Sequence, residues 1–114
     1  MALGKWRPEN FVAIIDRNHV QLDGCERDIM PLGDVAAKIA AFGIHTESCD
    51  GHDVRALLAA CAKATTVKGP VVIIAETIKG KGVSFMEGNH VWHGKPIDDA
   101  AFVAAMSELE QGVP

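Results

Sequence analysis

The sequence lacks the features that would place it in a membrane, in a secretory pathway or on nucleic acid. Its strongly apolar runs, Phe11–Ile15 and Val71–Ala75, are far too short to cross a bilayer. The N-terminus has no apolar core of the kind found in signal peptides. The lysines and arginines are scattered along a chain with a net charge of −4, which argues against a nucleic-acid-binding surface. We therefore expect neither a membrane nor a nucleic acid as a partner.

Cysteine is scarce, and its pattern favours a cytoplasmic location. Cys25, Cys49 and Cys61 are odd in number and form no C-x-x-C pair, so we interpret them as free thiols in a reducing compartment. The 114 residues leave room for a single domain. A hydrophobic content of 48% is high for so short a chain, and surplus apolar surface often lies against a partner. A dimer or a hetero-oligomer is therefore expected.

Apolar runs alternate with amphipathic stretches along the chain. Strands are predicted at Phe11–Ile15, Ile44–Cys49 and Val71–Ile74. The last of these runs is rich in β-branched residues and is expected to be central in the sheet. Helices are predicted to follow Pro31, Asp53, and Asp98 or Asp99. This alternation implies right-handed crossovers and an α/β fold, with a parallel sheet of about three main strands and flanking helices.

The apolar residues also predict which faces are buried. The continuous run Phe11–Ile15 is typical of a strand that is covered on both faces. In the helix after Pro31, Gly43 sits where a C-terminal cap is expected. Each helix is expected to carry an apolar stripe along one side, and the stripe of the last helix is expected to face a core. The three stripes are Val35, Ile39 and Phe42; Leu57, Leu58, Cys61 and Ala62; and Phe102, Val103, Met106 and Leu109.

Three polar stretches follow the three predicted strands. Asn18 follows the first strand, Asp50-Gly51-His52 the second, and the glycine-rich segment Lys79–Lys95 the third. Ligands of such sheets bind at the carboxyl ends of the parallel strands, which share one edge. We therefore expect all three stretches at that edge. Asp50-Gly51-His52 itself is interpreted as a strand-to-helix turn in which Asp53 caps the next helix.

The turn around Asn18 has the donor atoms of a hard-cation site. The side-chain oxygen of Asn18 and the carbonyl oxygen of Val20 can face one Mg²⁺ ion, which prefers oxygen ligands. The alternative is a plain Asx turn after a strand, with Leu22 in the core. Asp16 and Asp23 either surround the metal ligands or hold the turn through hydrogen bonds from side chain to backbone.

The segment after the third strand carries glycines, lysines and histidines. A K-G-x-G loop after a buried strand can bring backbone close to an anion. The candidate anion-binding residues are Gly80, Lys81 and Gly82. His93 and His90 can donate a hydrogen bond to a phosphate and exchange protons near neutral pH. The alternatives are solvation of Lys79 and Lys81 and an exposed loop position for His90, and we interpret Trp92 as packing that holds the loop.

The joint pattern of these motifs resembles that of transketolases. The D-x-N turn and the L-D-G turn match the second half of their diphosphate-binding motif, and K-G-K-G, F-M-E and W-H-G-K match split-type N-terminal subunits. The resemblance extends from about Glu9 to Lys95. It implies thiamine diphosphate bound through Mg²⁺, with Asn18 and Val20 as metal ligands. The other site residues that it implies are Leu22 beneath the thiazolium ring, Gly80, Lys81 and Gly82 near the diphosphate, and His93 and His90 in the active site.

Two parts of the family's site are missing from these residues. The G-D-G stretch that supplies a charged Mg²⁺ ligand is absent, and so is the pyrimidine-binding domain with the Glu that activates the cofactor. Residues 1–114 therefore resemble a single partial thiamine diphosphate-binding domain, the carboxyl-terminal portion of a cofactor domain. The resemblance implies two partner chains, one with the G-D-G segment and one with the pyrimidine-binding domain. Without the G-D-G strand, we expect an unpaired edge or an uncovered apolar face near Phe11–Ile15.

Two functions are compatible with this resemblance. The first is that of a subunit or fragment of a transketolase-like enzyme, inactive alone, that transfers a two-carbon ketol unit between sugar phosphates or related molecules. The second is that of a truncated domain without catalytic activity, which acts only as an interaction module. Co-purification with a protein that carries G-D-G would favour the first function.

Overall fold

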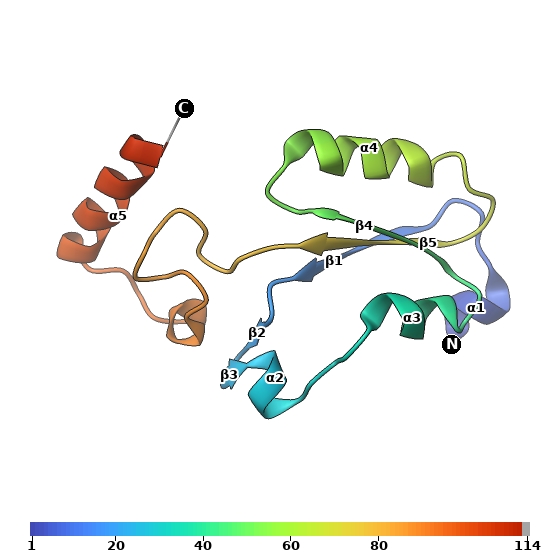
Figure 1. Cartoon of the computed structure of the whole chain (residues 1–114), viewed down its shortest axis with the longest axis horizontal. Helices are drawn as coiled ribbons and strands as arrows, with labels where there is room; N and C mark the ends of the chain where they lie inside the picture. Colours follow the sequence, from blue (N-terminus) through green and yellow to red (C-terminus); the bar gives the residue numbers. More distant parts are fainter. Residues whose placement is uncertain (113–114) are drawn as a thin grey trace. The chain divides into compact units, whose positions relative to one another are not determined.

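A computed structural model describes residues 1–112 of the chain (Figure 1). The elements are, in order, α1 (Ala2–Trp6), β1 (Val12–Arg17), β2 (Val20–Gln21), β3 (Gly24–Cys25), α2 (Glu26–Ile29), α3 (Val35–Ala40), β4 (His45–Asp50), α4 (Val54–Ala64), β5 (Val71–Glu76), η1 (His90–His93) and α5 (Asp99–Gly112). No helix within the described residues is long and apolar enough to cross a membrane. The chain divides into two compact units. Unit 1 comprises Met1–Arg17 and Leu32–Thr77, and unit 2 comprises Asn18–Pro31 and the residues from Ile78 onward.

Unit 1 is built on a three-stranded parallel sheet in the order β1-β5-β4. The central strand β5 pairs with β1 from Val12↔Val71 onward and with β4 from His45↔Val71 onward. The three strands therefore end at one edge of the sheet. Residues Val71 to Ala75 of β5 are all buried. These observations confirm the predicted parallel α/β fold and the central position of the third strand.

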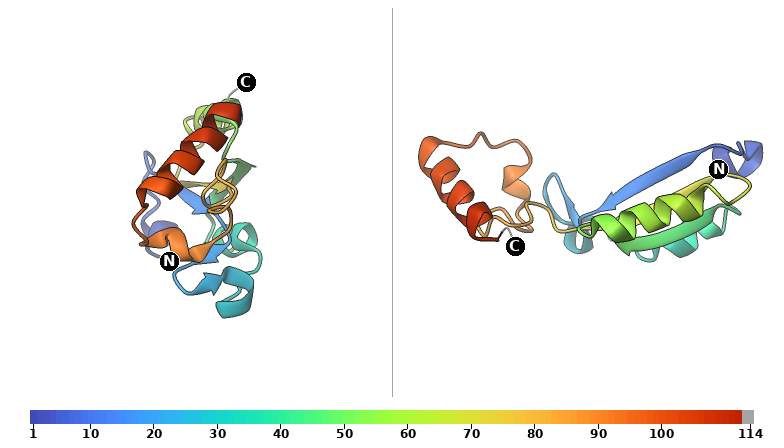
Figure 2. Two further views of the ribbon diagram at one scale, coloured as in Figure 1. Left: turned by 90° about the vertical axis from the view of Figure 1, so that its left-hand side faces the viewer. Right: turned by 90° about the horizontal axis from the view of Figure 1, so that it is seen from above.

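Helices lie on both faces of the sheet (Figure 1, Figure 2). On one face, Ala60 and Ala64 of α4 form a buried cluster with Val71 and Ile73 of β5. On the other face, α1 and α3 pack their apolar side chains against a second cluster. Its buried members are Ile44, Val72 and Ile74, and its partly buried neighbours include Leu3, Val35, Ala36 and Ile39. Successive side chains of β5 point alternately into these two clusters. The strand therefore needs an apolar residue at every position.

The boundaries of α3 follow from local capping. The helix begins at Val35 rather than directly after Pro31, because the Asp34 carboxylate accepts a hydrogen bond from the Ala37 N–H group at 2.8 Å. Gly43 lies just beyond the end of the helix and has a φ of +73°, a left-handed conformation that glycine adopts at little cost.

β1 lies at the edge of the sheet and is covered on one face only. Val12 and Ile14 are 46% and 57% exposed, whereas Ala13 and Ile15 pack against the cluster on the α3 side. The expectation that the run Phe11–Ile15 is covered on both faces is therefore wrong, because α4 packs on β4 and β5 instead of β1. The expected open edge and uncovered apolar face are confirmed, since β5 is the one described strand that pairs with β1.

Unit 2 contains the antiparallel hairpin β2–β3 and the helix α5. The Asp98 carboxylate accepts a hydrogen bond from the Ala101 N–H group at 2.8 Å, so Asp98 is the one of the two expected caps that the structure uses. The expectation that the apolar stripe of α5 faces a core is wrong for the described residues. Ala105 is buried, whereas the large side chains are 40–66% exposed, namely Phe102, Val103, Met106 and Leu109. Leu109 lies close to Gly82 of the glycine-rich segment, but its side chain is still 41% exposed.

Candidate functional site

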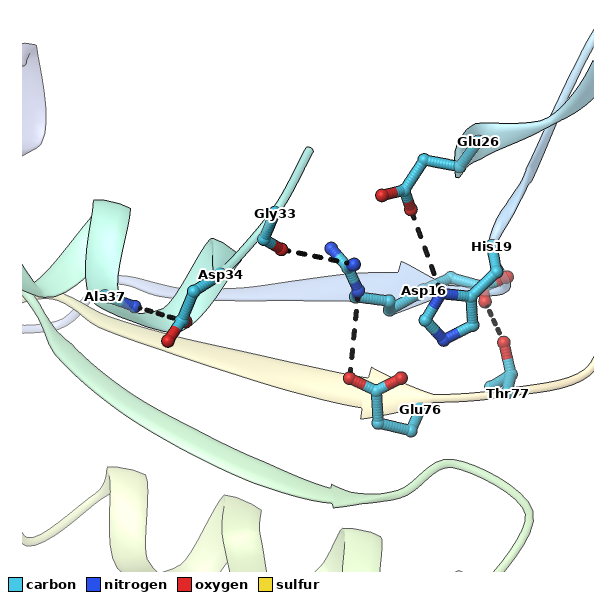
Figure 3. Close-up of polar contacts among 9 residues, drawn as sticks. Asp16, His19, Glu26, Gly33, Asp34, Ala37, Glu76 and Thr77 are labelled. Atoms are coloured by element: carbon cyan, nitrogen blue, oxygen red, sulfur yellow. Dashed lines mark hydrogen bonds and ion pairs between the residues drawn. The ribbon is translucent and has the colours of Figure 1, made fainter. Parts of the chain in front are cut away.

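The carboxyl ends of β1 and β5 are tied together by polar side chains (Figure 3). The Thr77 hydroxyl donates a hydrogen bond to the Asp16 carboxylate. The Arg17 guanidinium lies 3.9 Å from the Glu76 carboxylate and donates to the carbonyl of Gly33 at 3.4 Å. Arg17 is only 13% exposed in its side chain, so this end of β1 is well anchored. Asp16 therefore has a structural partner at the point where the chain leaves the sheet.

Asn18 forms an Asx turn immediately after β1, as the alternative to a metal site expected. Its side-chain oxygen Oδ1 accepts a hydrogen bond from the Val20 N–H group at 3.0 Å. His19, between them, has a left-handed φ of +59°. Asn18 and Val20 are both half-buried. The turn therefore brings the amide oxygen of Asn18 and the peptide groups of Val20, the two candidate metal ligands, into one short loop.

The loop continues into the β2–β3 hairpin, which exposes Leu22. The strands pair through Val20↔Cys25 and Gln21↔Gly24, so Leu22 and Asp23 form the tip. Leu22 is 64% exposed. The alternative that Leu22 belongs to the core is therefore wrong for the described residues, and its side chain is available to a ligand or to another part of the protein.

The turn after β4 is structural. The His52 N–H group donates to the Asp50 carboxylate at 2.8 Å, and Asp53 caps α4 by accepting from the Arg55 N–H group at 2.8 Å. A Cβ atom at Gly51 would lie 3.0 Å from the carbonyl oxygen of Glu76, so glycine allows the turn to approach the end of β5 closely. The interpretation of this segment as a capped turn is confirmed.

The glycine-rich segment after β5 is folded tightly on itself. Gly80 and Gly82 have φ values of +71° and +91°, and a Cβ atom at Gly80 would lie 2.6 Å from the Met86 carbonyl oxygen. The Lys81 N–H group donates to the Ile78 carbonyl at 3.2 Å. The Gly82 N–H group donates to the Glu87 carboxylate at 3.0 Å. The glycines are thus required by the fold of the loop itself, and Lys81 is an exposed cationic side chain on this loop.

Trp92 holds the segment that carries the two histidines. Its indole N–H group donates to the Phe85 carbonyl at 3.0 Å, and the rings of Phe85 and Trp92 are 5.3 Å apart. The Lys95 ammonium lies 4.5 Å from the centre of the Trp92 ring. This confirms the packing role of Trp92. The short helix η1 that results presents His93 exposed and His90 half-buried.

A contact with α5 that the sequence motifs did not indicate also fixes the glycine-rich segment. The Glu108 carboxylate accepts hydrogen bonds from the backbone N–H group and the hydroxyl of Ser84, the latter at 2.7 Å. These bonds hold the pKa of Glu108 below its ordinary value, with the backbone bond the larger cause. Ser84 and Glu108 are 24 positions apart, and neither belongs to a motif, so no local pattern could have paired them.

The turn at Asn18 fits a metal ion only as part of a ligand set. Its two candidate donors are neutral oxygens, which suit Mg²⁺ in type but supply no negative charge. Within residues 1–112, no group of three or more His, Cys, Asp or Glu side chains is placed to hold a metal ion. A charged ligand or phosphate oxygens must complete the coordination if Mg²⁺ binds at this turn.

Comparison with known proteins places the chain among transketolases. Residues 2–110 match the family described as transketolase, thiamine diphosphate binding domain. The chain is 38% identical over 112 residues to the 6-deoxy-6-sulfo-D-fructose transketolase subunit SqwG of Clostridium sp. (strain MSTE9), and the match covers 97% of this chain and 41% of that protein. It is 32% identical over 110 residues to an apulose-4-phosphate transketolase subunit of Actinobacillus succinogenes, and this match covers 96% of this chain and 40% of that protein.

A solved structure supports the same assignment. The transketolase of Campylobacter jejuni subsp. jejuni superposes with a TM-score of 0.86 at 28% identity, over 96% of this chain and 17% of that chain. The chain spans about two-fifths of the length of the curated relatives that it matches. The resemblance of the chain to transketolases is therefore confirmed. The chain belongs to the family of the thiamine diphosphate binding domain of transketolase.

Proposed function

We propose that these residues form part of the thiamine diphosphate and Mg²⁺ site of a transketolase-type transferase. The observation that carries the proposal is the position of Asn18 and Val20 in one short loop at the carboxyl end of β1, where Asn18 Oδ1 lies 3.0 Å from the Val20 nitrogen. In this proposal Asn18 Oδ1 and the Val20 carbonyl oxygen are Mg²⁺ ligands. The exposed Leu22 packs against the thiazolium ring.

The glycine-rich segment takes the other roles in this proposal. Lys81 supplies positive charge near the diphosphate, and Gly80 and Gly82 give the loop the shape that brings it there. His93 contacts the diphosphate and the substrate, and His90 supports it from the same helix η1. Thiamine diphosphate supplies the carbanion chemistry by which C–C bonds are broken and formed. The protein side chains hold the cofactor, orient the substrate and exchange protons with it.

The remaining parts of the site lie outside these 114 residues in our proposal. They include the G-D-G segment with its charged Mg²⁺ ligand and the pyrimidine-binding domain with its activating Glu. We call these residues together with those parts the complete enzyme. It acts in the cytoplasm on a ketol donor such as a sugar phosphate, as a dimer or a hetero-oligomer. The names of the relatives from Clostridium and Actinobacillus support this substrate class, because they specify a sulfosugar and a sugar phosphate.

The surface beside β1 supports the proposal that further chain docks there. β1 offers an unpaired edge, and Ile14 next to that edge is 57% exposed. On α4, Val54 and Leu58 are 68% and 65% exposed. Lys63 of α4 bonds to Glu47 of β4 at 3.0 Å, so the flank of α4 with Val54 and Leu58 is turned the other way, toward β1. An added parallel strand and a helix would cover both surfaces.

Substitution of Asn18 tests the metal assignment in the complete enzyme. Loss of an outer-shell partner costs about 10- to 100-fold in metal affinity, so we expect Asn18→Ala to weaken Mg²⁺ binding by about 100-fold or more. Asn10→Ala is the matched control, because Asn10 lies just before β1, at its opposite end. Calorimetric titration of Mg²⁺ in the presence of thiamine diphosphate measures both variants. Equal affinity for the two variants would refute the assignment.

Substitution of His93 tests the catalytic assignment and the competing function. His93→Ala should lower kcat with little change in stability, because the side chain is exposed. His45→Ala, an exposed histidine at the start of β4, is the control. If the complete enzyme has no transketolase activity and Mg²⁺ does not bind, the proposal fails, and the competing function of a domain without catalytic activity is favoured.

A further inference from the structure

The turn that carries the candidate metal ligands is closed by a second pair of residues. The backbone N–H group of Glu26 donates to the carbonyl of His19 at 2.9 Å. The Glu26 carboxylate lies 3.9 Å from His19 Nδ1 (Figure 3). We propose that His19 and Glu26 are positioning residues that fix the relative orientation of Asn18 Oδ1 and the Val20 carbonyl for metal binding. This inference rests on the proposed function and assigns to both residues a role that no motif indicated.

The conformation of His19 determines the shape of the turn. Among residues 1–112, two residues other than glycine have a positive φ, namely Arg7 and His19. A left-handed residue reverses the chain direction locally, and here it returns the Val20 N–H group to Asn18 Oδ1 at 3.0 Å. If His19 adopted an extended conformation, this hydrogen bond would be lost. The positions of Asn18 Oδ1 and the Val20 carbonyl oxygen relative to each other would then no longer be fixed.

Contacts with Glu26 stabilise His19 in this conformation. Only a small share of residues other than glycine adopt the left-handed region, and although histidine is enriched there, the conformation still costs free energy that contacts with the surroundings must offset. The hairpin pairing of Val20 with Cys25 places Glu26 directly opposite His19. Its side chain is only 15% exposed and approaches the imidazole from one side, while its backbone holds the His19 carbonyl. Glu26 therefore contacts His19, the residue between the two candidate ligands, through both its backbone and its side chain.

The test compares substitutions at His19, which change its backbone preference, with one that removes the Glu26 side chain and leaves its backbone hydrogen bond to His19 in place. Valine is β-branched and disfavours the left-handed region strongly, whereas asparagine tolerates it. In the complete enzyme, we expect His19→Val to weaken Mg²⁺ binding about 10- to 100-fold in the presence of thiamine diphosphate, as for outer-shell partners. His19→Asn should restore affinity to within about threefold of the parent. Glu26→Ala should weaken binding about 10-fold and keeps the test decisive if His19→Val fails to fold.

The readouts separate positioning from general structural damage. Without metal, amide hydrogen exchange at Val20 should be faster in His19→Val and Glu26→Ala, because its bond to Asn18 is no longer maintained. At saturating Mg²⁺, kcat should return to nearly the parent value, since a positioning residue acts through the metal. Arg7→Val is the matched control, because Arg7 is also left-handed, with φ +45°, but ends α1 and lies before β1. It should leave Mg²⁺ affinity unchanged.

The outcomes distinguish this inference from the proposed function. If Asn18→Ala loses Mg²⁺ affinity while His19→Val and Glu26→Ala keep the parent affinity, the positioning role is refuted and the metal site stands. If Arg7→Val weakens Mg²⁺ binding as much as His19→Val does, the effect is general strain and the positioning role is again refuted. If Asn18→Ala itself has no effect on Mg²⁺ binding, the proposed function fails, and the positioning role fails with it.

Discussion

Two isoleucines on the same face of the sheet are predicted to differ in their contribution to stability. Ile73 is fully buried in β5 against α4. Ile14 is its register partner in β1 and is 57% exposed. Their side chains are identical, and their strands are paired. The cost of Ile73→Ala therefore measures how well α4 covers the sheet. The cost of Ile14→Ala measures how far the surface of β1 is exposed.

The magnitudes follow from burial. Ile→Ala removes three carbon groups, worth about 0.8 kcal/mol each when fully buried, or about 2.4 kcal/mol. A cavity term adds to this at Ile73, so Ile73→Ala should lower the free energy of unfolding by about 2–5 kcal/mol. Because Ile14 is 57% exposed, Ile14→Ala should cost about 1 kcal/mol. If the remaining parts of the complete enzyme cover Ile14, the cost of Ile14→Ala in the complete enzyme should rise to about 2.4 kcal/mol. The additional 1.4 kcal/mol corresponds to about tenfold weaker binding of those parts to the surface beside β1.

Urea unfolding of the 114-residue chain and of the complete enzyme measures these costs. Val103→Ala serves as a control, because Val103 is an exposed apolar residue of α5 outside the sheet. Equal costs for Ile14→Ala and Ile73→Ala in the 114-residue chain would refute the claim that the surface beside β1 is uncovered. An Ile14→Ala cost that stays near 1 kcal/mol in the complete enzyme would refute the proposal that further chain docks on β1.

Three further predictions concern individual side chains. The lowered pKa of Glu108 means that its bonds to Ser84 persist above about pH 4.5, its ordinary value, and are lost as the pH falls through the lowered pKa, which amide exchange at Ser84 should report. Burial raises the pKa of the Cys49 thiol, whereas Cys61 is exposed, so alkylation followed by mass spectrometry should modify Cys61 before Cys49. Asp53→Ala should lower the free energy of unfolding by about 1 kcal/mol, and Asp53→Asn should recover most of it.

Local patterns in the sequence predicted the fold and the principal turn. The β-branched run from Val71 predicted the central strand, because a strand covered on both faces needs apolar side chains at successive positions. Asp53 predicted the start of α4 through a capping bond that spans two or three residues. The D-x-N spacing predicted the turn at Asn18 for the same reason, since its hydrogen bond is local. In each case the stabilising interaction lies within the pattern itself.

Burial and long-range contacts could not be predicted in this way. The apolar residues Ile14, Phe102 and Val103 resemble core residues in sequence, yet they are exposed in the structure, because hydropathy does not specify which element covers a side chain. The bonds between Ser84 and Glu108 join residues 24 positions apart. The left-handed conformation of His19 has only a weak signal in its residue type, since histidine is enriched in that region but most histidines do not adopt it.

Calorimetric titration of thiamine diphosphate with Mg²⁺ tests the central claim most directly, in the 114-residue chain and in the complete enzyme. The turn offers an amide and a carbonyl oxygen, and no described cluster of three metal-binding side chains adds charge. Loss of a charged ligand costs several kcal/mol, so the 114-residue chain should bind on the order of a thousandfold more weakly than the complete enzyme. Equal, tight binding by the 114-residue chain would contradict the account, because the Asn18 turn would then be sufficient without the G-D-G segment.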